Sequence, residues 1–177
     1  MKSKSSLSDG FRAVLGRAGG SLGGLLGFSE KPAVTGVCHL VLRGADGRVK
    51  EARTANTVCT AAKNGMAENL LASPSGYPKP GWMAIGTGSP TGTGEADKLG
   101  GEVARVALTS KTRTGAVVTM IGDYAAGVPA TEQIITEAGI FDVVTADTVK
   151  MWCSASFGAI TKGVLDTLQI TWTLTVS

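Results

Sequence analysis

His39 is the only histidine in the chain, and it is the side chain best suited to act as a general base. It lies inside the apolar run Val37–Leu42. In such a run, a hydrogen-bonded histidine in the core or on a sheet face is more common than a catalytic base. We therefore interpret His39 as structural. A small hydrolase that uses His39 as its base is the alternative.

The three cysteines, Cys38, Cys59 and Cys153, are too few and too widely spaced for a zinc knuckle or a disulfide framework. Free cysteine behaves as a small apolar residue and is often buried. We predict that all three are buried in a protein of a reducing cell. The sequence predicts no metal site and no cofactor.

Glycine is concentrated in residues 86–94, which read Gly-Thr-Gly-Ser-Pro-Thr-Gly-Thr-Gly. A phosphate-binding P-loop would continue into Gly-Lys-Ser/Thr, and this segment does not, so we predict a structural loop. Glu132, Glu137 and Asp142 follow at intervals of five. On a strand an odd interval places neighbours on opposite faces, which argues against a catalytic carboxylate pair. We predict no catalytic residue.

Trp82, Trp152 and Trp172 each lie in an apolar segment that is typical of a strand. A buried tryptophan adds a large apolar area to a core, and we favour that interpretation. The alternative is a carbohydrate-binding β-sandwich in which an exposed tryptophan stacks on a sugar ring.

The elements that position these side chains are predicted to be mostly strands. Leu168–Val176 alternates apolar and polar residues, as a strand with one buried face does. Asp46-Gly47 favours a hairpin turn within residues 37–54. Further strands are predicted over 81–86, 105–108, 115–124, 133–144 and 149–157, a helix over 57–72, a helical turn within 95–105 and a bulge at Gly139. The predicted fold class is mainly β: an antiparallel β-sandwich with one α-helix packed on it and an extended N-terminal arm.

Two parts of the chain differ in composition. Residues 34–177 form the predicted β-sandwich domain; their charges balance, which argues against a nucleic-acid partner. Residues 1–33 form a predicted flexible Gly/Ser/Leu-rich arm that carries the whole net charge of +3. No stretch has the roughly 18 apolar residues of a membrane span, so no membrane partner is predicted. The side chains expected to dock the arm on a partner are Phe11, Leu15, Leu22, Leu25, Leu26 and Phe28, and a disordered tail is the alternative.

Three segments, in this order, resemble a known family. They are Asn56–Leu71; Met83–Gly88 followed by Leu99, Glu102 and Arg105 in the spacing L-x-x-E-x-x-R; and Ile135–Asp142 with the alternating strand 168–176 after it. Together they are similar to phage tail-collar fibre proteins and related phage virion proteins. The resemblance covers residues 37–176.

This resemblance implies a structural protein of the virion that is assembled in the host bacterial cytoplasm. It implies a homo-oligomer, a trimer or a ring, whose partners are other phage virion proteins, and it implies no catalysis. The chain stops at Ser177, directly after the last strand, without the long shaft of a tail fibre. The expected place is therefore the tail, as a collar, fibre-adaptor or baseplate component. The alternative is a decoration protein of the phage head.

The motif residues are expected to form the fold. Gly86 and Gly88 are expected to let the chain turn sharply after a strand. Glu102 and Arg105 are expected to pair on one face of a helical segment or across subunits. Glu137 is expected to accept backbone amides and to anchor the neighbouring bulge.

Overall fold

The computed structural model describes residues 33–69, 79–89, 98–142 and 151–177. The chain divides into two units, Met1–Pro32 and Ala33–Ser177, and the description that follows concerns the second. The predicted arm of residues 1–33, with its apolar side chains, lies outside the described residues except for Ala33.

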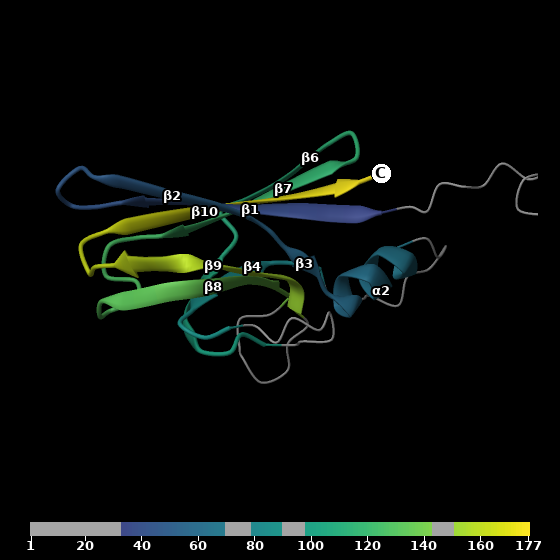
Figure 1. The fold of residues 1–177 in the computed structure, drawn as a ribbon. Helices are drawn as coiled ribbons and strands as arrows, with labels where there is room; N and C mark the ends of the chain where they lie inside the picture. Colours follow the sequence, from purple (N-terminus) through teal and green to yellow (C-terminus); the bar gives the residue numbers. More distant parts are fainter. Residues whose placement is uncertain (1–32, 70–78, 90–97, 143–150) are drawn as a thin grey trace, which may run out of the picture. The chain divides into compact units, whose positions relative to one another are not determined.

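Two antiparallel sheets of five strands each form the second unit (Figure 1). The first sheet has the order β2 (Val49–Ala55), β1 (Val34–Arg43), β10 (Thr167–Val176), β7 (Val117–Tyr124) and β6 (Ser110–Thr114). The second has the order β3 (Thr57–Val58), β9 (Met151–Lys162), β8 (Gln133–Phe141), β4 (Trp82–Gly86) and β5 (Glu102–Ala107). Helix α2 (Thr60–Glu68) packs against β9. The predicted β-sandwich with one packed helix is confirmed.

The core lies between the sheets because their strands alternate apolar and polar side chains. In the first sheet, β1 and β10 pair so that Leu40 faces Ile170 and Cys38 faces Trp172, and all four side chains are fully buried. The second sheet contributes residues such as Ile140 to the same core. Burying one large apolar side chain stabilises a fold by about 1.5–3 kcal/mol, so this interior accounts for most of the stability.

The predicted hairpin is confirmed. Strands β1 and β2 are joined at Gly44–Arg48, where the Gly44 amide donates to the Arg48 carbonyl over 2.8 Å. Gly47 has a φ of 80°, the left-handed conformation that makes Asp-Gly a turn signal. The helix is shorter than predicted, because residues 57–58 pair with β9 as a short strand before α2 begins at Thr60.

Two strands differ from the prediction. Residues 102–107 form strand β5, so the predicted helical turn is wrong over that part of 95–105. Strand β6 was not predicted, because its sequence Ser-Lys-Thr-Arg-Thr has no apolar side chain. It forms at a sheet edge, where Lys111 and Arg113 keep contact with solvent.

Two of the three tryptophans are buried: Trp172 is fully enclosed and Trp152 is 6% exposed. Trp82 is half-buried and packs against a second, smaller cluster of buried residues that includes Phe141. Core packing is therefore confirmed for Trp152 and Trp172. The carbohydrate-binding alternative needs an exposed tryptophan, which excludes Trp152 and Trp172 and leaves the partly exposed Trp82.

Cys38, Cys59 and Cys153 are buried and free, as predicted. Burial raises the pKa of each thiol, because an apolar surrounding disfavours the thiolate. We expect all three thiols to stay unreacted with a thiol reagent at pH 8 in the folded protein, and three equivalents to react in denaturant. Absorbance of the released chromophore measures both states. Rapid reaction of one thiol without denaturant would contradict this burial.

Candidate functional site

Residues of the second and third motif segments meet on the outer face of the second sheet, the face turned away from the main core. Of the first segment, Cys59 packs in the same small apolar cluster as Leu99 and Phe141, and the end strand 168–176 belongs to the first sheet. In the second sheet β4 pairs with β5 on one side and with β8 on the other, so that Gly86 lies opposite both Glu102 and Glu137. One row along, Ala84 lies opposite Arg105 and Gly139. We call the following residues the motif cluster: Gly86, Gly88, Leu99, Glu102, Arg105, Glu137, Gly139 and Phe141.

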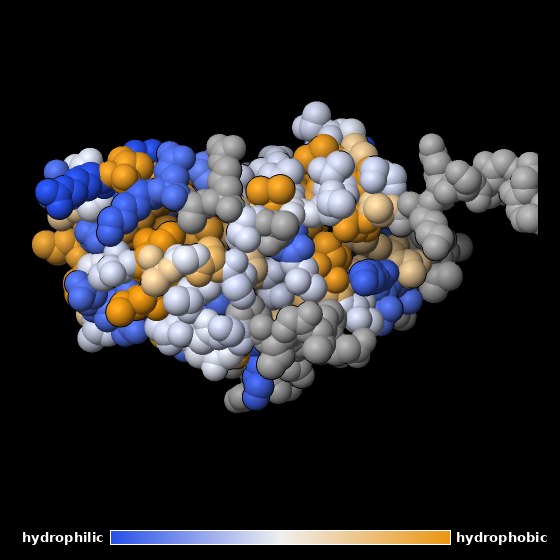
Figure 2. All heavy atoms as spheres, in the orientation of Figure 1, coloured by the Kyte–Doolittle hydropathy of each residue, from blue (hydrophilic) through white to orange (hydrophobic). Residues whose placement is uncertain are grey.

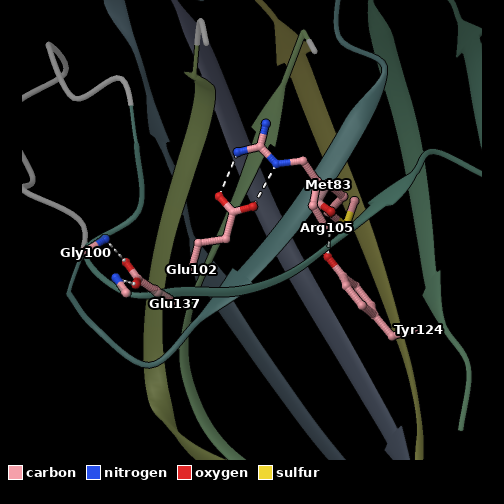
Figure 3. A network of polar contacts seen from close by, with 7 residues as sticks. Met83, Gly100, Glu102, Arg105, Tyr124 and Glu137 are labelled. Carbon is pink, nitrogen blue, oxygen red and sulfur yellow. Dashed lines mark hydrogen bonds and ion pairs between the residues drawn. The ribbon is translucent and has the colours of Figure 1, made fainter. Parts of the chain in front are cut away.

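Glu137 is the centre of the motif cluster, and its side chain is fully buried. Its Oε1 accepts hydrogen bonds from the amides of Gly88, over 3.0 Å, and Gly101, over 2.7 Å. Its Oε2 accepts from the amide of Gly100 over 3.0 Å (Figure 3). The neighbouring Thr136 hydroxyl donates to the Gly88 carbonyl over 2.6 Å. Strand β8 thereby holds both ends of the segment between residues 88 and 100.

The glycines around Glu137 are required by close approach and not by a turn. A Cβ on Gly86 would overlap Glu137 Oε1 and would lie 2.7 Å from the Gly101 carbonyl oxygen. A Cβ on Gly88 would lie 2.7 Å from the backbone of Gly100. Neither Gly86 nor Gly88 has a positive φ, so the sharp turn expected from the sequence is not their role. They let backbone amides reach a buried carboxylate.

Glu102 and Arg105 form an ion pair, as predicted, but on a strand and not on a helix. Arg105 Nε donates to Glu102 Oε1 over 2.8 Å, and Nη2 donates to Oε2 over 2.7 Å (Figure 3). Three residues apart on a regular strand would place them on opposite faces. The pairing of β5 with β4 passes from Ala104 directly to Glu102, so Val103 is an extra residue. This bulge brings both side chains to one face.

The arginine of this pair is almost completely enclosed, since its side chain is 5% exposed. Its guanidinium carbon lies 4.0 Å from the centre of the Phe141 ring, which adds a cation–π contact to the two hydrogen bonds. Phe141 in turn belongs to the small cluster with Ala84 and Leu99. The contact of Arg105 with Phe141 therefore links edge strand β5 to β8, and Glu102 holds the guanidinium in place for it.

We expect Arg105→Lys to lower the free energy of unfolding by about 1–2 kcal/mol, because an ammonium makes neither the paired hydrogen bonds nor the flat contact with Phe141. Urea unfolding followed by circular dichroism measures the change. The control is Arg48→Lys, at a side chain that is 85% exposed, where no measurable change is expected. Equal effects at both positions would contradict the enclosed geometry.

Gly139 does not form the predicted bulge. It pairs directly with Ser154, and the register irregularities of β8 and β9 lie on either side of it, between Ile135 and Glu137 and next to Phe141. A Cβ on Gly139 would lie 2.9 Å from the Phe141 ring and 3.2 Å from a Leu99 methyl carbon. The glycine is required because large side chains pack over it.

Two further buried polar groups were not predicted. The Tyr124 hydroxyl donates to the Met83 carbonyl over 2.8 Å and thus joins the two sheets through the core (Figure 3). Burial raises the pKa of Tyr124. Lys162 is buried, and its Nζ donates to the Asp166 carbonyl over 2.7 Å, while burial lowers its pKa. A lone tyrosine or lysine carries no sequence signal for such a contact.

His39 lies on the outer face of the first sheet. Its Nε2 is 3.4 Å from Glu51 Oε2 on the neighbouring strand, so it is a sheet-face histidine, one of the two predicted environments. A surface hollow of about 450 Å³ lies elsewhere, between the β1–β2 and β9–β10 turns. It is lined in part by Arg48, Lys50 and the exposed Leu165. Polar and apolar side chains lie side by side at that end of the molecule (Figure 2).

Within the described ranges, no group of three or more His, Cys, Asp or Glu side chains is placed to hold a metal ion. The same residues include no helix with the length and apolar character needed to cross a lipid bilayer. Glu137 is fully buried and accepts three amide hydrogen bonds, so its carboxylate holds backbone in place.

No family model matches the chain, and no curated protein or solved structure matches it either. The contacts of the motif cluster and the exposed faces of the sheets are thus the observations on which a function rests.

Proposed function

We propose that the chain is a structural protein of a bacteriophage virion, a collar, fibre-adaptor or baseplate component of the tail, which acts by protein–protein assembly and not by catalysis. One observation carries this proposal. Residues of the second and third segments that resemble tail-collar fibre proteins come from distant parts of the chain and meet in the motif cluster, and Cys59 of the first segment packs in the same small apolar cluster as Leu99 and Phe141. Chance likenesses in short segments have no reason to share one set of contacts.

The contacts within the motif cluster support a scaffolding role. The buried Glu137 carboxylate fixes the ends of the segment between residues 88 and 100, and the contact of Arg105 with Phe141 links edge strand β5 to β8. Such contacts rigidify a fold and leave its outer surfaces for partners. The single histidine is paired with Glu51 on an open sheet face, which suits a surface contact better than general-base catalysis.

The proposed partners are other virion proteins and further copies of the chain, in a trimer or a ring. The segment of residues 1–33 is proposed to dock the sandwich domain, because it combines apolar side chains with the net charge of +3. In this proposal the chain is assembled in the host bacterial cytoplasm and is then retained in the virion.

Immunogold electron microscopy of purified particles from the phage that encodes the chain tests the proposal. Label on the tail is expected, and label on the head would favour the alternative of a capsid decoration protein. A particle preparation without the chain would overturn both. In the same particles, a tagged chain lacking residues 2–31 is expected to be depleted relative to a tagged full-length chain, if the arm docks.

A further inference from the structure

The outer face of the first sheet carries few charges over β1, β10, β7 and β6, whereas Glu51 lies on the same face on edge strand β2. We call the outward side chains of β1, β10, β7 and β6 the threonine face. Threonine predominates on it, and its centre is formed by Thr119, Thr171, Thr173, Thr175, Val37 and Ile121. Apart from His39, its only charged residues are Arg43 and Asp123. Exposed surfaces of soluble domains are about 25–35% charged, so this face has the character of an interface.

The β6 edge of the same sheet is protected against the addition of a further strand. Edge strand β6 directs Lys111 and Arg113 towards the inner side of the sheet, since they pair with Met120 and Val118. Inward-pointing charges at an edge discourage a further strand from pairing there. Valine is nevertheless left exposed on the face itself, where Val37 is 47% exposed. Association through the face therefore suits this sheet better than association through its β6 edge.

The two charges of the threonine face lie at one end of it, on either side of β10. Arg43 pairs with Thr167 on β10, and Asp123 pairs with Gln169 on the other side of that strand. A hollow of about 350 Å³ lies between them. In the part of the chain that the structure describes, neither charge has an ion-pair partner. Asp123 accepts hydrogen bonds only from the neutral side chains of Thr109 and Gln169.

We propose that the threonine face packs against the same face of a second copy, about a two-fold axis that runs along β10. This inference rests on the proposed assembly function and specifies a two-fold contact, which a ring of paired copies contains and a single trimer does not. The axis places β1 of each copy over β7 of the other, because the two strands flank β10 on opposite sides. The end of β1 that carries Arg43 then lies over the end of β7 that carries Asp123, and the hollow has room for the incoming guanidinium.

The size of the face suits this contact. Four strands spaced about 4.8 Å apart and about 27 Å long cover about 520 Å². Two such faces together reach the total of about 1,000 Å² that a small specific interface needs, and two packed sheets lie within about 30° of parallel, so the twisted faces can meet over most of their area. Valine and threonine side chains would fill the contact, as they do between the sheets of a sandwich.

Light scattering of the purified full-length chain after size-exclusion chromatography tests the contact. The expected mass is twice 18.0 kDa, or a multiple of that pair. Thr173→Arg, at the centre of the face, is expected to weaken pairing about a hundredfold, because it buries an unpaired charge. The matched control is Ala159→Arg on β9, an exposed position outside the face, which is expected to leave the mass unchanged. Circular dichroism confirms that each variant is folded.

A charge swap tests the axis. Arg43→Glu and Asp123→Lys are each expected to weaken pairing about tenfold, since like charges then meet. The double variant is expected to restore it, because the exchanged charges meet again across the axis. A wild-type monomer at high concentration, or an oligomer that Thr173→Arg leaves intact, would overturn this inference. If either result is obtained and the particles contain the chain, the tail proposal still holds. If the chain pairs in solution but is not found in the particles, only the tail proposal is overturned.

Discussion

Replacing Glu137 by glutamine is expected to lower the free energy of unfolding by about 3 kcal/mol or more. The carboxylate is fully buried and accepts three backbone hydrogen bonds, two at Oε1 and one at Oε2. Hydrogen bonds to a charged group contribute about 1.5–3 kcal/mol each, roughly twice the value of neutral ones.

Glutamine keeps the size of the side chain but not its acceptors. One oxygen becomes an NH₂ group that points at amide donors, so at least one backbone amide loses its partner and the new NH₂ gains none. With Gly101 and Gly88 on Oε1 and Gly100 on Oε2, either orientation of the amide leaves such a clash. Glu137→Ala removes both oxygens and orphans all three amides, so it is expected to cost more than glutamine does.

Urea unfolding followed by circular dichroism gives the midpoint and slope for each variant. Thermal unfolding is expected to move down by about 6–12 °C, as about 3 kcal/mol does in a domain of this size. Glu132→Gln is the control, since Glu132 is an exposed carboxylate at the start of the same strand segment, and no measurable change is expected there. A Glu137→Gln protein as stable as the control would mean that the three hydrogen bonds do not form.

The sheet architecture could be predicted because it is encoded locally. In β10, alternation from Leu168 to Leu174 separates buried from outward side chains with a period of two, and only a strand has that period. The β1–β2 turn was predictable for a similar reason, because Asp46-Gly47 favours the positive φ that this hairpin turn requires. Each signal fits within ten residues of sequence.

Strands β5 and β6 were not predicted correctly, because their sequences alone do not show the alternation of a strand and their structure depends on the strands they pair with. The extra residue Val103 interrupts the alternation in β5. Glu102 and Arg105 therefore share a face three residues apart, which is the spacing expected of a helix. The residues of β6 are all polar, because both faces of this edge strand are largely exposed to solvent. Only the pairing partners, β4 and β7, distinguish these segments from a helical turn and a loop.

The site shows the same limit. The motif residues were found from a family resemblance, and the expectation that Glu137 accepts backbone amides is met by the structure. The donors could not be named, because Gly100 and Gly101 precede Glu137 by 37 and 36 residues. The reason for the glycines was also misjudged. Close approach to a carboxylate and a turn with positive φ both select glycine, and a sequence does not tell them apart.

Gly86→Ala is expected to lower the free energy of unfolding by about 2–3 kcal/mol, because it overpacks a site that has no room for a methyl group. The new Cβ would overlap Glu137 Oε1 and would meet the Gly101 carbonyl oxygen at 2.7 Å, and backbone cannot move aside as a flexible side chain can. The measurement is again urea unfolding. Gly158→Ala on β9 is the matched control: its Cβ would meet nothing within 4 Å, so alanine there is expected to be neutral or slightly stabilising.

A double variant separates overpacking from a general weakness of glycine substitutions. Glu137→Ala removes the carboxylate that the Gly86 methyl group would strike, so the methyl group costs less in that background. The two losses are therefore expected to be less than additive, by about 1 kcal/mol or more, as for residues in direct contact. Gly158→Ala and Glu137→Ala touch no common atom and are expected to add. If Gly86→Ala and Glu137→Ala also add, then Gly86 does not make room for the carboxylate, and the close approach of the two is wrong.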